Sequence, residues 1–170
     1  MTDLIRPILK GLESAHGLLG LQLSDLKNED AVRQARGDTG CSISWIVGHL
    51  LSFRCSALTA CGADHPNPYQ EKFSFRTPAS DGSDYPQIGE LHRAWDEVHG
   101  KLIRALSELT EEQLRAGTDI FGPQVDQSLL EALDFFPGHE AYHLGAVGLL
   151  RVQWGYRPTQ ELAMEAKGIY

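Results

Sequence analysis

Two histidines of this chain have the spacing of a metal-binding pair. His139 and His143 are four residues apart, so on a helix both imidazoles leave the same face, one turn apart. Imidazoles at that separation can hold one metal ion. Seven histidines in 170 residues give about 0.3 such pairs by chance, so the interpretation needs support from the surrounding sequence.

The surrounding residues predict that this pair faces the protein interior. At about 100° per residue, several apolar side chains lie within about 50° of the line through the two histidines: Ala132, Phe136, Ala146, Val147 and Leu150. The pair is therefore expected at the centre of a buried stripe. Each imidazole nitrogen buried without a partner costs about 1–3 kcal/mol, and a shared metal ion would satisfy both rings.

A third ligand is expected from another helix, and His49 is the candidate. It lies about seven residues into an apolar helical segment, between Trp45 and Phe53. The alternative is an edge histidine bonded to a backbone carbonyl. Depth along the bundle favours the metal site if the long connection after residue 61 is a crossover. At ~1.5 Å per residue, His49 then lies about 10 Å and His143 roughly 15 Å from the same end. A plain up-down-up-down arrangement places His143 some 22 Å down.

Other side chains with chemical potential have simpler explanations. His16 lies near the apolar stripe of the first helix, where it is a core residue or a fourth group at the metal site. His92 and His99 lie at the side of the third helix, where solvated or capping roles are expected. Glu140 lies off the line of the pair and is expected to meet solvent or an arginine. Packing is expected for the remaining candidates: Cys41, Cys55, Cys61, Tyr142, Trp45, Trp95 and Trp154.

Four long segments with helical spacing carry these residues. Apolar residues recur at three and four over about 4–26, 42–61, 87–109 and 128–154. The segment 42–61 is apolar almost all round, which predicts a deeply buried helix. Thr110 and Ser128 each begin a capping-box sequence. No period-two run indicates a strand, so we predict an all-α fold, a four-helix bundle forming a single domain over residues 1–170.

Two segments lack this periodicity. Residues 62–86 contain repeated Pro, Gly and Asp signals, and a connection of this length is typical of a crossover or a functional loop. Residues 117–127 are irregular as well. We expect these two segments to form the mouth of a binding site over the rigid bundle.

Composition excludes several classes of protein. Lys and Arg number 15 against 23 Asp and Glu, a net charge of −8, which disfavours a nucleic-acid partner. No apolar run approaches the roughly 18 residues of a membrane helix. The first residues lack the pattern of a secretory signal, and three cysteines without a CxxC pair suggest reduced thiols, so a cytoplasmic protein is expected.

Two stretches of the sequence resemble the DinB-like (DinB/YfiT-like) superfamily. They are SISWIVGHLLSFR at 42–54 and HEAYHLGAVGLLR at 139–151, with LTEEQL at 109–114 between them. The resemblance covers essentially the whole chain. It implies a four-helix bundle with a long crossover between the second and third helices. It also implies a divalent metal ion, zinc or nickel, held by His49, His139 and His143.

The resemblance also implies a reaction class. Some relatives are transferases that use a low-molecular-weight thiol, and three imidazoles leave open coordination positions, as in catalytic sites. The expected function is therefore a metal-dependent S-transferase acting on a small molecule, with a metal-bound water or thiolate as the reactive species. A non-catalytic metal-stabilised binding or stress-response module, with His16 as fourth ligand, is the alternative. A metal-dependent hydrolase is a minor one, and a homodimer is expected.

The sequence departs from the resemblance at two positions. Pro137 falls two residues before His139, removes the backbone bond to the Leu133 carbonyl, and is expected to kink or split the helix. Such a kink either aims His139 or spoils its alignment. Ala146 stands where many relatives carry glutamine, so a hydrogen bond from that side chain is missing.

Overall fold

Four long helices form the body of the protein. The computed structural model describes residues 2–74 and 76–168. The long helices are α1 (Arg6–Leu23), α3 (Ile43–Ala60), α5 (Ile88–Glu108) and α7 (Leu129–Gln153). A 3-10 turn, η1 (Asp3–Ile5), precedes α1. Four short helices lie between or after the long ones: α2 (Asn28–Ala31), α4 (Gln70–Phe73), α6 (Glu111–Arg115) and α8 (Thr159–Ala166). The described residues contain no strand, which confirms the all-α prediction.

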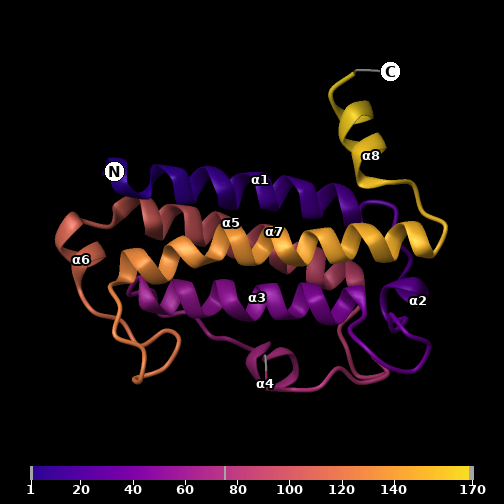
Figure 1. Ribbon diagram of the computed structural model, residues 1–170, viewed down its shortest axis with the longest axis horizontal. Coiled ribbons are helices and arrows are strands. Elements are labelled where there is room, and N and C mark those ends of the chain that lie inside the picture. Colours follow the sequence, from indigo (N-terminus) through magenta and orange to yellow (C-terminus); the bar gives the residue numbers. More distant parts are fainter. Residues whose placement is uncertain (1, 75, 169–170) are drawn as a thin grey trace.

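The connection between α3 and α5 is a crossover. The chain leaves one end of α3, passes through α4 and returns to the opposite end of the bundle before α5 begins (Figure 1). Helices α3 and α5 are therefore parallel, and α7 is antiparallel to both. This is the arrangement in which the depths of His49 and His143 are predicted to agree.

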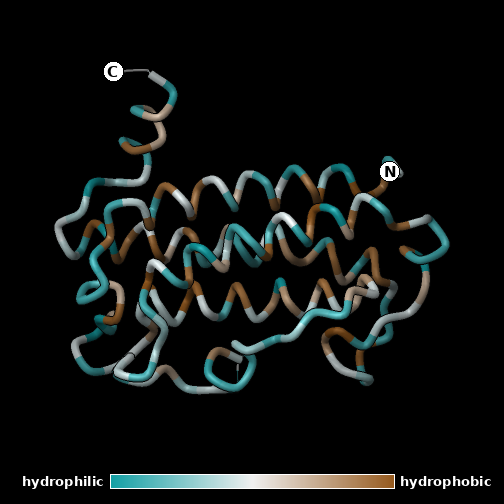
Figure 2. Tube along the Cα trace, turned by 180° about the vertical axis from the view of Figure 1, so that it is seen from behind, coloured by the Kyte–Doolittle hydropathy of each residue, from teal (hydrophilic) through white to brown (hydrophobic). Residues whose placement is uncertain are grey.

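Helix α3 is the most deeply buried element. Fourteen of its eighteen residues are buried, because α5 and α7 pack against it on the bundle side and α4 covers its outer side. Hydrophobic residues recur along the four long helices, whereas much of the chain between them is hydrophilic (Figure 2). The side chains of the four long helices enclose one apolar core, which sets the positions of the polar groups inside it.

The predicted helix bounds agree with the structure to within about two residues, except at the end of α1 (Leu23). Pro137 does not split α7, which runs from Leu129 to Gln153 without interruption. Gly11 of α1 lies against the proline ring, because a Cβ there would come within 2.6 Å of the Pro137 Cβ. Of the two expected outcomes, a kink or a split, the split is wrong, and the glycine gives the proline ring room at the contact between α1 and α7. Over the described range, none of the helices has the length and apolarity needed to cross a membrane.

Candidate metal centre

His49 lies near the start of α3, where local capping fixes the helix. The side chain of Ser42 accepts a hydrogen bond from the backbone N–H of Trp45 at 3.2 Å, which satisfies one free donor of the first turn. Trp45 then stacks on the His49 ring, with 4.9 Å between ring centroids. The imidazole is 4% exposed, so its nitrogens need partners within the protein.

The crossover supplies one of those partners. His49 Nδ1 lies 2.8 Å from the backbone oxygen of Phe73, the last residue of α4. A carbonyl oxygen can only accept a hydrogen bond, so Nδ1 carries the proton and Nε2 keeps a free lone pair. Gly48 makes this approach possible, since a Cβ at residue 48 would lie 2.6 Å from the Phe73 ring. The bond to a backbone carbonyl, given above as the alternative to metal binding by His49, is therefore present. It does not exclude metal binding, because it uses Nδ1 and leaves Nε2 free.

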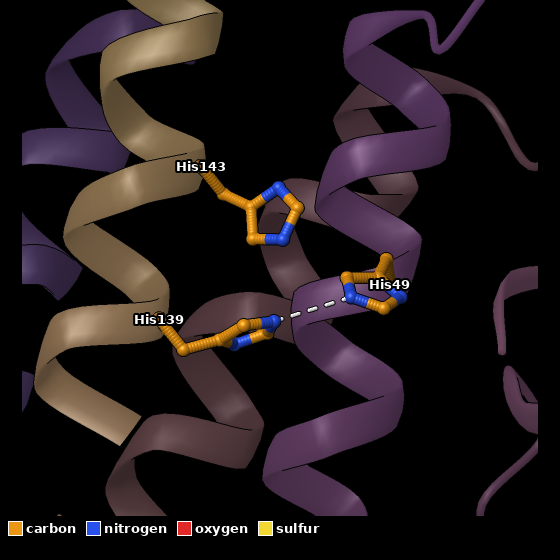
Figure 3. A group of neighbouring side chains, drawn as sticks. All are labelled: His49, His139 and His143. Atoms are coloured by element: carbon orange, nitrogen blue, oxygen red, sulfur yellow. Dashed lines mark hydrogen bonds between the residues drawn. The ribbon is translucent and has the colours of Figure 1, made fainter. Parts of the chain in front are cut away.

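Helix α7 brings the other two imidazoles to the same point. His139 and His143 project from successive turns of α7 toward His49 on α3 (Figure 3). The Nε2 atoms of His49 and His139 are 3.3 Å apart, and one nitrogen from each of the three rings lies within 4.8 Å of the others. The three side chains predicted from sequence therefore converge.

The His pair does not sit at the centre of the buried stripe of α7. The stripe is centred on Leu133, Glu140, Leu144 and Val147, and the two histidines lie on its flank toward α3. The prediction that the pair lies at the centre of the stripe is wrong, because it treats Glu140 as a residue outside the stripe, whereas Glu140 is buried. The place of the histidines on the flank leaves both rings half-buried, with a route to solvent that a fully buried ligand would lack.

Burial keeps the three rings neutral. It lowers the pKa of His139 to about 3 and that of His143 to about 4, and neighbouring imidazoles add to the effect. It also lowers the pKa of His49, although the hydrogen bond to Phe73 opposes the change. Near pH 7 all three therefore present unprotonated nitrogens, which is the state a metal ligand requires.

These residues fit a divalent cation. The facing Nε2 atoms of His49 and His139 belong to neutral rings and lie 3.3 Å apart, so one cation would coordinate both. Three imidazole nitrogens are a donor set typical of zinc and of other late first-row metals. Across residues 2–74 and 76–168, the group of possible ligands at this point contains these three histidines and no carboxylate or thiolate.

Arg54 and Glu140 occupy the bundle interior next to the imidazoles. Both are buried, and the Arg54 guanidinium lies 3.4 Å from the centroid of the Trp95 ring. Burial raises the pKa of Glu140, while its hydrogen bonds from Arg54 favour the ionised form. Of the two expected partners of Glu140, solvent or an arginine, the arginine is confirmed, and it is Arg54. Arg54 itself is absent from the residues predicted from sequence, although a lone arginine in so apolar a helix is a usable signal.

His16 and His99 belong to this interior network and not to the metal centre. Their rings stack with 3.8 Å between centroids. His99 Nδ1 lies 3.1 Å from Arg54 Nη1, so burial and the guanidinium lower the pKa of His99 to about 4. His16 Nε2 lies 3.4 Å from an Asp96 oxygen. The expected solvated or capping role of His99 is wrong, and so is a fourth-ligand position for His16.

The three cysteines are free thiols, and none belongs to the metal centre. Burial raises the pKa of Cys55 and of Cys61 to about 11, and that of Cys41 in the same direction. A thiol with a raised pKa is a poor nucleophile near neutral pH. This agrees with the expected packing role.

A cavity of about 630 Å³ is lined by Phe53 and Phe135, whose rings pack against the imidazoles, whereas none of the three histidines is among its described lining residues. Both irregular segments predicted to form a mouth line it, the first through Gln70, Ser74 and Arg76 and the second through Asp119–Gly122 and Gln127. Phe53 of α3 also lines it, and its ring centroid lies 4.7 Å from that of His49 and 4.5 Å from that of His139. A second cavity, of about 500 Å³, lies between α1 and α7 away from the three imidazoles.

Comparisons with known proteins agree with this architecture. The sequence profile of the DinB superfamily matches residues 13–147. A crystal structure of a DinB-like protein from Bacillus cereus ATCC 10987 superposes with a TM-score of 0.67 at 19% identity. The superposition covers 91% of this chain and 95% of that one, and at this identity it supports the fold alone. Among proteins with curated descriptions, none matches the chain in sequence.

Proposed function

The chain belongs to the DinB superfamily, and from that premise we propose that it is a metal-dependent enzyme whose ion is held by His49, His139 and His143. The observation that carries the proposal is the convergence of three neutral imidazoles from two helices, with one nitrogen of each within 4.8 Å of the others. Zinc and nickel are the ions that this donor set favours.

A divalent ion bound by three protein ligands lowers the pKa of a group that it coordinates, or polarises an oxygen of the substrate. The protein supplies orientation and a dry surrounding. The Phe73 carbonyl fixes the tautomer and the direction of the His49 ring. Phe53 covers one side of His49 and of His139 with an apolar ring.

The proposed reaction is the transfer of a small thiol to a small electrophile: the thiol sulfur forms a bond to the electrophilic carbon, the leaving group (chloride for a chlorinated aromatic acceptor) departs with the electron pair of its bond, and the thiol proton passes to solvent. The raised pKa values of Cys55 and Cys61 support an external thiol, since these side chains remain protonated near neutral pH. The cavity beside the imidazoles supports a small-molecule acceptor, because its volume lies within the usual range for such ligands, roughly 300–1,000 Å³.

The other two functions have less support. A structural metal site would use a fourth protein ligand, and His16 is engaged elsewhere with His99 and Asp96. A hydrolase would use a carboxylate as general base at the site. In the part of the chain that the structure describes, the ligand group contains no carboxylate, and Glu140 is paired with Arg54.

Metal analysis tests the first half of the proposal. The purified protein should contain about one divalent ion per chain, and His139→Ala or His143→Ala should remove most of it. His65→Ala is the matched control, because His65 lies in the crossover outside the group, and it should keep the metal. Equal metal content in all three variants would contradict the proposal.

Turnover tests the second half. Bacterial low-molecular-weight thiols are assayed with a chlorinated aromatic acceptor, before and after removal of the metal by a chelator. We expect turnover that depends on both the thiol and the metal. Stoichiometric metal without turnover for any thiol would favour the non-catalytic binding module.

We also propose that two copies associate through the outer face of α7. Large apolar residues on this face, spaced by three and four along the helix, are interrupted by two glycines: Phe135, Gly138, Tyr142, Gly145, Leu149 and Val152. The large ones are unusually exposed, Tyr142 by 76% and Leu149 by 75%. In an antiparallel pair related by a two-fold axis near residue 143, Tyr142 of each copy faces Gly145 of the other, and Leu149 faces Gly138. This complementarity favours a homodimer.

A further inference from the structure

The cavity beside the imidazoles has an aromatic wall. The rings of Phe53, Phe121, Phe135 and Phe136 form one cluster, with centroids between 5.0 and 6.4 Å apart for neighbouring pairs. Phe53, Phe121 and Phe135 line the cavity. Phe135 also stacks on the imidazole of His139, with 4.9 Å between centroids and 27° between planes. The wall therefore leads without interruption from the cavity to the metal ligands.

Seven of the described residues that line the cavity are polar: Ser52, Ser56, Gln70, Ser74, Arg76, Asp119 and Gln127. Gln127 differs from the others because its Nε2 is buried without a hydrogen-bond partner among the described residues. The terminal torsion of a glutamine is soft, so rotation of this amide can present Nε2 to a ligand in the cavity. A buried donor without an acceptor costs stability, which a ligand carrying an acceptor would recover. Charges of both signs, from Arg76 and Asp119, border the cavity, so it does not select for a net charge.

We propose that this cavity binds a neutral, planar aromatic molecule that carries a hydrogen-bond acceptor, with its ring against Phe53, Phe121 and Phe135 and its acceptor on the Gln127 amide. Aromatic rings prefer offset-stacked or edge-on neighbours at the distances found here. The inference deepens the proposed function, on which it rests for the role of the cavity as the acceptor-substrate site. It names aromatic electrophiles as the substrate class.

Two probes of the same shape test the proposal. The planar ketone 2-acetylnaphthalene carries one acceptor, and 2-ethylnaphthalene carries none. Both absorb in the ultraviolet, so binding to the purified protein is measured by equilibrium dialysis over a series of probe concentrations. We expect both to bind, the ketone more tightly. Gln127→Leu should weaken binding of the ketone about 5- to 10-fold and leave the hydrocarbon unchanged. Phe121→Leu, which retains the apolar area but removes one ring, should weaken binding of both.

Matched variants separate the cavity from the rest of the surface. Gln124→Leu lies in the same loop but outside the cavity lining, so it should bind both probes as the wild type does. Equal binding of the ketone to the wild type and to Gln127→Leu would overturn the proposal, as would affinities insensitive to Phe121→Leu or the absence of binding by either probe.

Metal content measured on the same samples distinguishes the two hypotheses. A wild-type protein that binds the ketone through Gln127 and contains no metal would contradict the proposed function and support this binding site. A metal-replete protein that binds neither probe would contradict the binding site alone. Titration after chelation should leave the affinity for both probes within about twofold, because the ring and amide contacts do not involve the ion.

Discussion

Arg54 and Glu140 join α3 and α7 through a buried, bidentate ion pair. Arg54 Nε and Nη2 donate to the two carboxylate oxygens of Glu140 at 2.7 and 2.8 Å. Glu140 directly follows the ligand His139, and Arg54 is on the same helix as His49. The pair therefore fixes the register of the two helices that carry the metal ligands. The remaining guanidinium N–H groups reach the Leu12 carbonyl and His99.

Removing one partner of this pair should be strongly destabilising. Glu140→Gln leaves the Arg54 guanidinium buried without a countercharge, which typically costs about 3–5 kcal/mol. We expect a loss of that size in the free energy of unfolding, measured by urea denaturation. The exposed pair of Lys101 with Glu97 offers the control, and Glu97→Gln should leave the urea midpoint nearly unchanged.

The double variant Arg54→Met/Glu140→Leu sharpens this test. Because it buries no unpaired charge, it should unfold at a higher urea concentration than Glu140→Gln, although it removes more polar contacts. If its loss of stability relative to the wild type equalled the sum of the losses in Arg54→Met and Glu140→Leu measured separately, the charges would not be coupled and the assigned role of the pair would be wrong.

Gly48 should control metal affinity without touching the metal. A methyl group at this position would collide with the Phe73 ring, and a shift of Phe73 removes the carbonyl from His49 Nδ1. Loss of such a supporting hydrogen bond typically lowers metal affinity about 10- to 100-fold. We expect Gly48→Ala to show this loss in a competition assay with a chromogenic chelator.

The control for Gly48→Ala is another helical glycine. A Cβ at Gly100 of α5 meets nothing within 4 Å, so Gly100→Ala should leave metal affinity unchanged and stabilise the protein by roughly 0.5–1 kcal/mol. Unchanged affinity in Gly48→Ala would show that the Phe73 carbonyl does not orient His49.

Acidification should destabilise the metal-free protein before its carboxylates titrate. The folded pKa values of His139, His143 and His99 are about 3, 4 and 4, against 6.5 for the unfolded chain. Above pH 6.5 these rings are neutral in the folded and in the unfolded chain, so they do not make the free energy of unfolding depend on pH. Below pH 6.5 these histidines bind protons in the unfolded chain but not in the folded chain, so the free energy of unfolding decreases between pH 6.5 and pH 5.

Urea denaturation of the chelated protein at pH 7.5, 6.0 and 5.0 measures this slope. His139→Ala should flatten it, because one of the three protonation sites is then absent from the unfolded chain. A free energy of unfolding that stayed constant or rose on acidification would contradict the assignment of these rings as neutral. Addition of zinc should stabilise the protein at pH 7.5 and have less effect at pH 5.0, because metal competes with protons for the imidazoles.

The convergence of His49, His139 and His143 is predictable from sequence because the signal of these residues is local. Helical spacing aligns His139 with His143, and the rise per residue fixes their depth relative to His49 once the crossover is assumed. These quantities depend only on which segments are helical. The helices themselves carry strong signals, such as the capping boxes at Thr110 and Ser128, and both are present.

The supporting residues are not predictable because their signal is tertiary. Glu140 resembles a surface residue until its partner on α3 is known, and placing it on the polar face shifts the predicted centre of the buried stripe. The position of the Phe73 carbonyl depends on how the crossover folds over Gly48. The periodicity of apolar residues in the sequence does not predict this conformation. Helix α8 is also absent from the prediction, since Gly155 and Pro158 are typical signals for the end of a helix and do not indicate that another helix begins after them.

A larger side chain at Gly145 should separate the proposed dimer without harming the monomer. In one chain a Cβ at Gly145 meets nothing within 4 Å, and leucine favours a helix over glycine by roughly 0.5–1 kcal/mol. In the antiparallel pair, however, the leucine occupies the space that Tyr142 of the other copy needs. We expect Gly145→Leu to sediment as a monomer with undiminished thermal stability, whereas Gly100→Leu sediments as the wild type does. A wild-type protein that is monomeric at high micromolar concentration, or a Gly145→Leu variant that remains dimeric, would contradict this interface.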